Sequence, residues 1–377
     1  MRVAFFTETF LPKVDGVVTR LRHTLEHLSQ MGDEALVVAP KYPEGGPGSY
    51  AGARIHRVAS VPFPPYPEVR IAPANPAVGR ALRRFDPDLI HAVHPFVLGM
   101  SAPYYARRLG VPLVASYHAH VAAYARFYGL GFLHEAARWY TRAIHNRARL
   151  NLCTSEATMR YLLAEGVERV HFWPQGVDAG FFRPDRASKE WRLRLSGGNL
   201  ESRLLLFVGR LAPEKGIERL KAVLREVPGT RLAVVGDGPA RRDLEREFAG
   251  SPVVFTGMLH GEDLAAAYAS ADIFVFPSTT ETLGLVMLEA LASGLPVVAA
   301  DAGATREVVE DGACGLLYDP DSDGALVRTV GRLVKDDVLR RRMGREARAT
   351  AERRSWQNAT EALRGFYELA RSGKGAE

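Results

Sequence analysis

The chain has 377 residues, of which 47% are apolar and 24% are charged, and its formal net charge is +6. This length exceeds one typical hydrophobic core and predicts two domains of ordinary size. Two cysteines far apart in the sequence exclude a disulfide framework and a cysteine-rich metal cluster. No apolar run approaches the roughly 18 residues that span a bilayer, so we expect a cytoplasmic protein that is soluble or peripheral to a membrane.

The excess of positive over negative charge lies entirely in the first half of the chain. Residues 1–180 contain 20 Lys and Arg against 14 Asp and Glu, whereas residues 181–377 contain 29 of each. A basic half suits an anionic membrane or an acidic substrate, and an ordinary solvated surface is the alternative.

Apolar runs alternate with helical patterns in this first half. We expect helices at 17–31 and 77–85, and the strands lie at 3–7, 36–39, 89–92 and 113–116. Prolines mark the joins between these elements. Strand–helix alternation of this kind predicts parallel βαβ units.

The same pattern restarts near residue 204. Helices are expected at 217–226 and from about Gly284, and the strands lie at 204–208, 231–235, 253–256, 273–277 and 295–300. The fold class is therefore α/β, with two Rossmann-like doubly wound domains facing each other across a cleft. We place the first domain at 1–175 and the second at 176–357, after a connector at about 174–202. The terminal helix at 358–377 is expected to pack back on the first domain.

Two cations follow the strand at 204–208, in the loop at 209–216. In open parallel sheets ligands bind beyond the carboxyl ends of the strands, so Arg210 and Lys215 stand where a ligand is expected. An arginine fork and a lysine point charge can neutralise a diphosphate. Two solvated loop charges are the alternative interpretation.

A second segment, residues 281–289, follows the strand at 273–277 and opens a helix. The amides of Leu283, Gly284 and Leu285 would be helix-start donors for a phosphate. Glu281 could accept hydrogen bonds from sugar hydroxyls, or serve as a helix N-terminal charge. Glu289 could hold a ribose, and because its neighbours are apolar, a buried carboxyl here would need a partner. Eight helical residues rise about 12 Å, which disfavours a glycosidase carboxyl pair about 5 Å apart.

The turn at 236–239 contains Gly236 and Gly238 directly after a strand. It resembles the start of a dinucleotide fingerprint but lacks the third glycine, because position 241 is Arg. An NAD-dependent oxidoreductase is therefore an alternative function. A tight turn with Pro239 at the first helical position explains the same residues without a ligand.

Two loops of the first half carry further candidates. His118 follows the strand at 113–116 and could bond a sugar hydroxyl, although a structural histidine remains possible there and more so at His120. Gly16 follows the first strand and would let a phosphate or sugar approach backbone amides, while Asp15 can cap the next helix. No third ligand at a recognisable spacing suggests a metal.

Basic and aromatic residues at 80–85 and 124–142 suit an interfacial helix or lipid head groups, with an ordinary amphipathic face as the alternative. No nucleic-acid-binding module is recognisable, so no nucleic acid partner is expected.

Together these segments resemble family 4 retaining glycosyltransferases of the GT-B fold. The resemblance covers nearly the whole chain and is strongest at 207–215, 236–239, 255–259 and 281–289, the last being similar to the Glu-x7-Glu element of the family. Within the family the chain looks most like sulfoquinovosyl-diacylglycerol synthases, through 116–121, 176–178, 255–257 and 282–289. It is also similar to GDP-mannose-dependent mannosyltransferases and diacylglycerol glucosyltransferases, through 8–12 and 15–17.

The resemblance implies roles for the matching positions. Arg210 and Lys215 would hold the diphosphate, Glu281 the donor sugar, and Glu289 the ribose. His118 would bond the sugar near C6, Gly16 would meet the phosphate or sugar, and Gly236 would belong to the donor site. The nucleobase would be framed by the backbone of Gly257, Met258 and Leu259. The family uses no metal, so no cofactor is expected.

We therefore expect a retaining enzyme that transfers a hexose from a UDP- or GDP-linked sugar to a diacylglycerol-like lipid at the inner face of the cell membrane. A soluble sugar or polyol acceptor is the alternative within the same chemistry. An oxidoreductase, a nucleotide-sugar epimerase and a non-catalytic sensor are the alternatives outside it.

Overall fold

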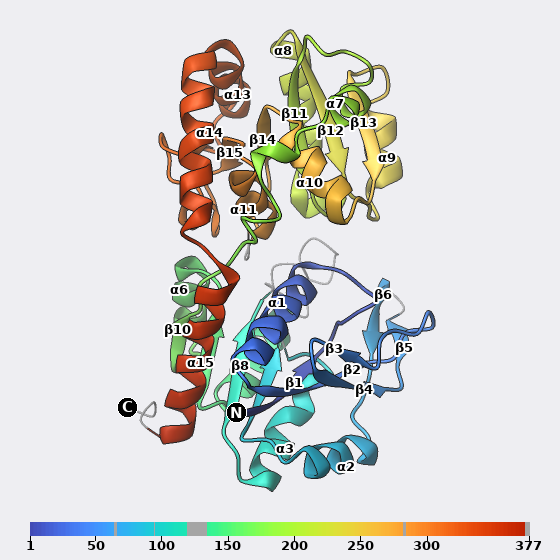
Figure 1. Cartoon of the computed structure of the whole chain (residues 1–377), viewed down its shortest axis with the longest axis vertical. Helices are drawn as coiled ribbons and strands as arrows, with labels where there is room; N and C mark the ends of the chain where they lie inside the picture. Colours follow the sequence, from blue (N-terminus) through green and yellow to red (C-terminus); the bar gives the residue numbers. More distant parts are fainter. Residues whose placement is uncertain (64–65, 94, 119–133, 282–283, 374–377) are drawn as a thin grey trace. The chain divides into compact units, whose positions relative to one another are not determined.

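A computed structural model describes residues 1–63, 66–93, 95–118, 134–281 and 284–373. The chain forms two compact units, and each is described by itself. The first consists of Met1–Gln175 together with Trp356–Glu377, and the second of Gly176–Ser355. The helix that returns to the first unit thus begins two residues before the predicted boundary at 358 (Figure 1).

The first unit contains an eight-stranded sheet in the order β10-β9-β8-β7-β1-β2-β4-β3. Its strands are β1 (Arg2–Thr7), β2 (Glu34–Pro40), β3 (Ser49–Tyr50), β4 (Ala53–Val58), β7 (Leu89–Val93), β8 (Leu113–Tyr117), β9 (Leu150–Cys153) and β10 (Val170–Phe172). Every neighbouring pair is parallel except β3 and β4. A separate antiparallel pair joins β5 (Val61–Phe63) and β6 (Tyr66–Ile71).

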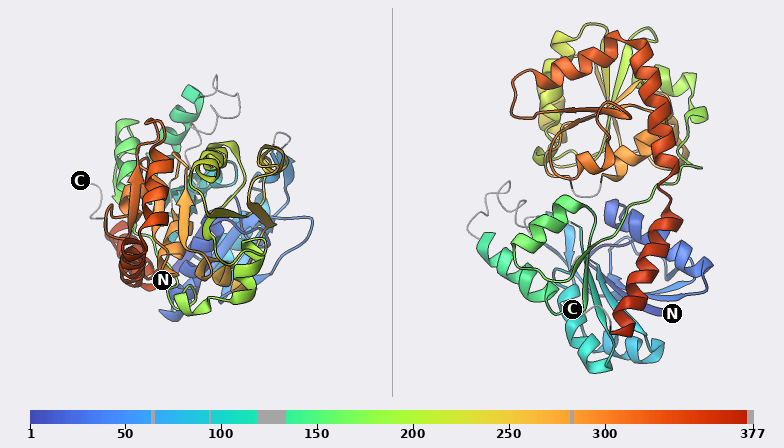
Figure 2. Two further views of the ribbon diagram at one scale, coloured as in Figure 1. Left: turned by 90° about the horizontal axis from the view of Figure 1, so that it is seen from above. Right: turned by 90° about the vertical axis from the view of Figure 1, so that its left-hand side faces the viewer.

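Alternate residues of the central strands enter two different cores. Val3 and Phe5 of β1 face a core shared with helices α1 (Gly16–Gln30) and α15 (Trp356–Ser372). Ala4 and Phe6 face the opposite core, shared with α2 (Pro76–Phe85) and α3 (Ala102–Leu109). Because strand side chains alternate with a period of two, a sheet with continuous apolar strands is covered by helices on both faces (Figure 2). In the described part of this unit, the other α-helices are α5 (His134–His145) and α6 (Glu156–Ala164).

The second unit contains a six-stranded, fully parallel sheet in the order β13-β12-β11-β14-β15-β16. Its strands are β11 (Arg203–Val208), β12 (Thr230–Val235), β13 (Val253–Gly257), β14 (Ile273–Phe276), β15 (Val297–Ala300) and β16 (Gly315–Tyr318). The chain adds strands outward on one side of β11 and then returns to its other side with β14. The strand order therefore reverses between β11 and β14, which is where open α/β sheets bind ligands.

Eight helices accompany this sheet in the described part of the second unit. They are α7 (Lys189–Leu195), α8 (Leu220–Glu226), α9 (Arg241–Glu247), α10 (Gly261–Ala269), α11 (Leu285–Ala292), α12 (Thr305–Val308), α13 (Ala325–Lys335) and α14 (Asp337–Glu352). Helix α11 is apolar on nearly every side, because it packs against both the sheet and α14.

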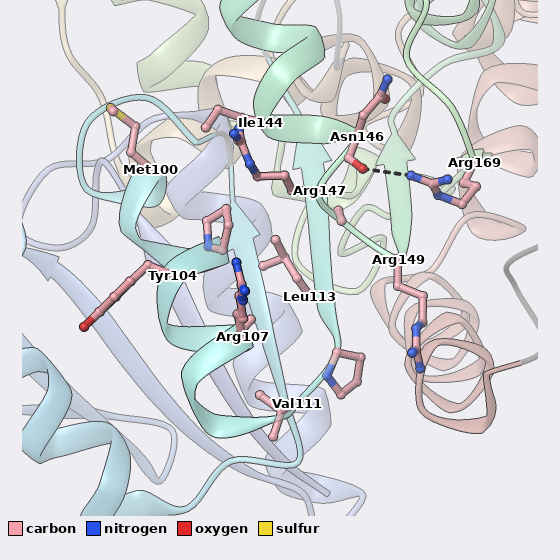
Figure 3. Close-up of a pocket in the computed structure, with 14 residues that line it drawn as sticks. Met100, Tyr104, Arg107, Val111, Leu113, Ile144, Asn146, Arg147, Arg149 and Arg169 are labelled. Carbon is pink, nitrogen blue, oxygen red and sulfur yellow. Dashed lines mark hydrogen bonds between the residues drawn. The ribbon is translucent and has the colours of Figure 1, made fainter.

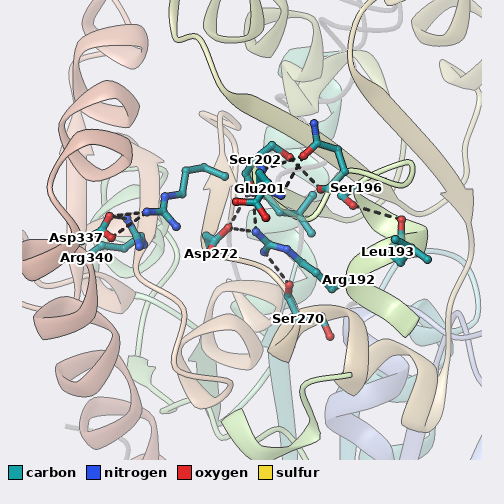
Figure 4. Close-up of polar contacts among 12 residues, drawn as sticks. Arg192, Leu193, Ser196, Glu201, Ser202, Ser270, Asp272, Asp337 and Arg340 are labelled. Carbon is teal, nitrogen blue, oxygen red and sulfur yellow. Dashed lines mark hydrogen bonds and ion pairs between the residues drawn. The ribbon is translucent and has the colours of Figure 1, made fainter. Parts of the chain in front are cut away.

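Hydrogen bonds from an arginine hold together the end of this sheet at which β11 and β14 begin (Figure 4). Arg192 of α7 donates to the carbonyl of Ser270 at 3.0 Å and to the carboxylate of Asp272 at 2.7 Å. The same carboxylate accepts the amide of Leu204 at 2.7 Å. These hydrogen bonds attach the predicted connector, 174–202, to the second unit. The connector contains the helix α7 and is not only a loop.

Most predicted elements lie within one or two residues of the observed ones. The predicted helix 217–226 is wrong at its start, because Gly216 adopts φ 64° and a 3-10 turn (Ile217–Arg219) precedes α8. The interpretation of Pro239 as the first helical residue is also wrong, since α9 begins at Arg241. The cap proposed for Asp15 is confirmed, because its carboxylate accepts the amide of Val18 at 2.9 Å.

Candidate functional site

The loops that follow β11 and β14 are joined at the point where the strand order reverses. Lys215 Nζ donates to Glu281 Oε2 at 3.0 Å, and the two side chains are only 17% and 13% exposed. The ammonium group also lies 5.6 Å from the centroid of the Phe276 ring. Two residues that are far apart in the sequence, each predicted to contact a donor, are therefore direct neighbours.

Glu281 also prepares the start of α11. Its second carboxylate oxygen, Oε1, accepts the amide of Gly284 at 3.0 Å. Gly284 adopts φ 66°, a left-handed conformation that glycine tolerates best, and Leu285 is the first residue of α11. The first amides of a helix have no intrahelical acceptor and form its positive end. Glu281 thus links a lysine ammonium to the residue that precedes α11, and the Gly284 amide, which was predicted to be a free phosphate donor, is engaged by that carboxylate. Leu283 lies outside the described residues.

Arg210 extends from the exposed side of the loop after β11. Behind it, the backbones of two loops approach so closely that only glycine fits. A Cβ atom on Gly236 would lie 1.9 Å from the carbonyl oxygen of Gly209, and one on Gly238 would lie 2.4 Å from that of Leu211. Leu211 in turn donates its amide to the carbonyl of Asp237 at 2.9 Å. Loop packing alone therefore explains the glycines at 236–238, without a dinucleotide.

The end of β13 continues this row of loops. The carbonyl of Gly257, which has φ 78°, accepts the amide of Gly236 at 2.9 Å. Met258 follows with 51% of its surface exposed, and Leu259 is partly buried. Gly257, one of the three residues predicted to frame the nucleobase, is thus hydrogen-bonded through its backbone to the loop after β12.

Glu289 occupies the second turn of α11 and has the partner that its apolar neighbours require. Tyr268 of α10, fully buried, donates its hydroxyl to Glu289 Oε2 at 2.8 Å. Burial raises the pKa of Glu289 to about 7, and the tyrosine hydrogen bond only partly opposes this effect. The carboxyl group consequently changes its charge near neutral pH.

In the first unit, the predicted site residues Gly16 and His118 follow β1 and β8. Gly16 is the first residue of α1, directly after the Asp15 cap. His118 follows β8 and is 2% exposed; its Nε2 lies 2.8 Å from Ser116 Oγ. His120 and most of the predicted aromatic and basic stretch at 124–142 lie outside the described residues.

Sequence reasoning missed two polar groups of this unit. Glu8 accepts backbone amides at 2.8–3.1 Å from a loop after β7, and burial raises the pKa of its carboxyl group. His91 lies inside β7 and bonds both Ser116 and Tyr367. A histidine within a predicted buried strand was a visible signal for such a network, because a buried imidazole needs partners.

A concavity of about 810 Å³ opens at the other end of β8, near Leu113. Its apolar wall includes Met100 and Tyr104, and four arginines contribute to its lining (Figure 3): Arg107, Arg147, Arg149 and Arg169. No acidic side chain lines it in the described structure. The excess positive charge of the first half is therefore partly gathered on one amphipathic surface.

Two further findings concern metals and membranes. Among residues 1–63, 66–93, 95–118, 134–281 and 284–373, no group of three or more His, Cys, Asp or Glu side chains could hold a metal ion. Within the same part of the chain, no helix is both long enough and apolar enough to cross a bilayer.

Comparison with known proteins identifies the architecture. Residues 193–350 match the family described as Glycosyl transferases group 1, and residues 14–181 match Glycosyltransferase Family 4. The chain superimposes on sucrose-phosphate synthase from Thermosynechococcus elongatus with a TM-score of 0.79 and 22% identity, covering 98% of both chains. Two Rossmann-like units with this likeness define the GT-B fold.

Curated relatives place it within that class. The chain is 40% identical to sulfoquinovosyl transferase SQD2 of Arabidopsis thaliana, covering 96% of this chain and 72% of the relative. It is 41% identical to a GDP-mannose-dependent alpha-mannosyltransferase of Mycolicibacterium smegmatis, over 98% and 97%. It is 30% identical to alpha-monoglucosyldiacylglycerol synthase of Streptococcus pneumoniae, over 88% and 78%. The chain belongs to glycosyltransferase family 4, and it is a glycosyltransferase that uses a nucleotide-sugar donor.

Proposed function

We propose that the protein transfers a hexose, with retention of its anomeric configuration, from a UDP- or GDP-linked sugar to a diacylglycerol-like lipid. The proposed binding of the sugar donor rests on the contacts among Lys215, Glu281 and the residue that precedes α11. These contacts lie where the strand order of the second sheet reverses. This arrangement collects positive charge where a diphosphate would bind, and it holds a carboxylate beside it for sugar hydroxyls.

The chemistry follows from charge development on the leaving group. As the bond between the anomeric carbon and the phosphate oxygen breaks, negative charge grows on the diphosphate. Arg210, Lys215 and the first amides of α11 stabilise that charge, so the step needs no metal. The acceptor hydroxyl attacks from the same face, and a phosphate oxygen takes its proton. No carboxylate nucleophile is required, and catalysis consists mainly of positioning and electrostatic stabilisation.

The Lys215–Glu281 ion pair has a specific part in this scheme. A lysine on a flexible stem must be held in place if its charge is to act at a defined point, and Glu281 holds it at 3.0 Å. The same carboxylate accepts the Gly284 amide, so one side chain both holds the lysine and fixes the backbone where α11 begins. Glu289 accepts hydrogen bonds from the ribose hydroxyls.

The lipid acceptor is supported by the relative named as a monoglucosyldiacylglycerol synthase. The arginine-lined concavity of the first unit lies at the end of β8 away from His118, so it would contact the membrane surface rather than the acceptor hydroxyl. Arg107, Arg147 and their neighbours offer charge to lipid phosphates beside an apolar wall. We propose a peripheral location at the inner face of the cell membrane.

Turnover with UDP- and GDP-sugars, over lipid and soluble acceptors, tests this proposal. Lys215→Ala should reduce kcat by a factor of about 10² to 10³, the usual effect of removing one preorganised donor. Glu281→Ala, which leaves that lysine without the carboxylate that holds it, should reduce kcat by a similar factor. Lys221→Ala, an exposed lysine on α8, is the matched control and should leave the rate unchanged. Full activity of the Lys215 variant would refute the site, and transfer to soluble acceptors alone would refute the lipid acceptor.

Two measurements complete the test. The configuration of the product, read by NMR coupling constants, should equal that of the donor. A thermal-shift series with UDP, GDP and ADP should identify the base, because a ligand that binds only the folded state raises the melting temperature. Undiminished turnover after exhaustive chelation is expected for a metal-independent reaction.

A further inference from the structure

A concavity of about 640 Å³ lies in the second unit, at the end of the sheet away from the Lys215–Glu281 contact. Its lining includes Arg203, the first residue of β11, and Asp272 and Pro296, which directly precede β14 and β15. One side of α14 completes the lining. Because Lys215 and Glu281 follow the carboxyl ends of β11 and β14, the concavity and the predicted donor site belong to opposite ends of one sheet.

Small residues and a close backbone contact shape this concavity. Ala269, Ala271 and Gly294 contribute to its walls without long side chains. A Cβ atom on Gly344, in the middle of α14, would lie 2.5 Å from the carbonyl oxygen of Gly294, so the helix and the loop before β15 touch through their backbones. Five arginines line the concavity, and four of them belong to α14. The charge of the lining therefore comes mainly from one helix.

Three of these arginines are held by acceptors of the protein. Arg203 and Arg340 share the carboxylate of Asp337, at 2.7 and 2.8 Å (Figure 4). Arg348 donates to three backbone carbonyls, at 2.7, 2.8 and 2.9 Å, and to the carboxylate of Glu352 at 2.7 Å. These contacts fix the wall of the concavity. They also leave two guanidinium groups with one carboxylate at Asp337, so positive charge remains in excess.

The other two arginines, Arg341 and Arg345, are exposed. In the described part of the chain, neither has a hydrogen-bond or ion-pair partner. They lie four residues apart, on one face of α14, where like charges repel. Asp272 is the one acidic residue of the described lining, and it already accepts from Arg192 and from the amide of Leu204. Two guanidinium groups with unused donors therefore line a concavity whose positive charge is not balanced.

We propose that this concavity is a second anion-binding site, which binds a phosphorylated ligand through Arg341 and Arg345. The planar guanidinium group offers parallel N–H donors that match two oxygens of a phosphate. The volume of the concavity lies within the range of small-molecule pockets, about 300–1,000 Å³. A protein partner is disfavoured, because such interfaces are anchored by exposed apolar residues and no large apolar side chain of the described lining is exposed. Neither arginine belongs to the proposed donor site, so the two proposals fail separately.

Isothermal titration calorimetry with inorganic pyrophosphate tests the proposal. The parent protein for these titrations is Lys215→Ala, so that the lysine of the predicted donor site does not contribute. Adding Arg341→Ala and Arg345→Ala should lower the affinity at least about tenfold, because charge-assisted contacts are lost. Adding Arg332→Ala and Lys335→Ala, which removes two exposed charges from α13, is the matched control and should change it less than about twofold. Equal losses in the two double substitutions, or a parent that does not bind pyrophosphate, would overturn the proposal.

Thermal unfolding provides a second readout. Pyrophosphate should raise the melting temperature of the parent and of the α13 control, because a ligand that binds the folded state stabilises it. The protein with Arg341→Ala and Arg345→Ala should gain much less. Arg341→Lys with Arg345→Lys keeps both charges but not the planar donors, so it should restore only part of the pyrophosphate affinity. An equal rise of the melting temperature in all proteins would overturn the proposal.

A soluble compound and a phospholipid head group present the same phosphate chemistry, and vesicles distinguish these two sources. Co-sedimentation is measured with phosphatidylcholine vesicles that contain or lack phosphatidic acid. If Arg341→Ala with Arg345→Ala abolishes the binding that depends on phosphatidic acid, the ligand is a lipid head group. If it weakens pyrophosphate binding and leaves vesicle binding unchanged, the ligand is soluble. Polyglutamate that binds through the same two arginines while pyrophosphate does not would overturn the assignment to phosphate and indicate an acidic polypeptide.

Discussion

Replacing Glu289 by Gln should change how the stability of the protein depends on pH. The carboxyl group has its pKa raised from 4.5 to about 7 by burial on α11. Between these values the folded protein binds a proton that the unfolded chain has lost, so raising the pH opposes folding. Glutamine keeps the shape of the side chain and can still accept a hydrogen bond from Tyr268, but it does not titrate.

The size of the effect follows from the two pKa values. One pKa unit corresponds to 1.36 kcal/mol, so Glu289 should cost up to about 3 kcal/mol of folding free energy as the pH rises from 4.5 to above 7. The Glu289→Gln variant lacks this cost. Its stability relative to the unsubstituted protein should therefore increase by about 3 kcal/mol over that range and level off on both sides.

Urea unfolding of both proteins at intervals from pH 4.5 to 8.5, followed by circular dichroism, measures this difference. Shared pH effects cancel, because every other titrating group is common to the two proteins. A difference in unfolding free energy that stays constant across the range would refute the raised pKa of Glu289.

The ionisation of Glu289 should also control nucleotide binding, because its proposed role is to accept hydrogen bonds from the ribose hydroxyls. Binding then favours the carboxylate, so calorimetry should show UDP or GDP binding more tightly at pH 8 than at pH 6. The affinity of the Gln variant should not follow this pH profile.

Three further substitutions and one control substitution, Gly250→Ala, test the packing of the second unit by thermal and urea unfolding. Gly236→Ala should lower the unfolding free energy by about 3 kcal/mol or more, because its Cβ would meet a backbone oxygen at 1.9 Å. The control Gly250→Ala, at φ 78° in open space, should lower it by only about 1 kcal/mol. Equal losses in the two variants would contradict the close-approach argument. Asp272→Ala should cost about 2–3 kcal/mol, since it leaves the partly buried Arg192 without its carboxylate, and a loss below 0.5 kcal/mol would contradict that role. Asp336→Ala should cost about 1 kcal/mol by removing the cap of α14, and an unchanged midpoint would show that the cap is dispensable.

The parallel sheets could be predicted because their strands are short apolar runs bounded by glycine and proline. Strand β11 contains one uninterrupted apolar run, Leu204–Val208, and a buried parallel strand accounts for such a short run better than a helix does. Strand β4 (Ala53–Val58) was not predicted, because its sequence is half polar and lies at a sheet edge region where burial is incomplete. The two-residue β3 and the three-residue β5 are too short to show a strand pattern.

The site could be predicted only in part. The rule that ligands bind beyond strand ends selected the loops of Lys215 and Glu281, but their ion pair joins residues 66 positions apart and needed the coordinates. The partner of His91 lies 276 positions away on the terminal helix, and no local pattern encodes that contact. The roles of Arg210, Gly16, Met258 and Leu259 toward a donor stay predictions.

The return of α15 to the first unit has a consequence for biosynthesis. Leu363, Tyr367 and Ala370 of this helix complete the core that β1 and α1 begin. A ribosome must therefore synthesise the intervening unit, about 180 residues, before that core can close. At about 5–20 residues per second, the nascent amino-terminal segment waits roughly 10–40 s with an uncovered apolar face. Molecular chaperones have that interval in which to shield it.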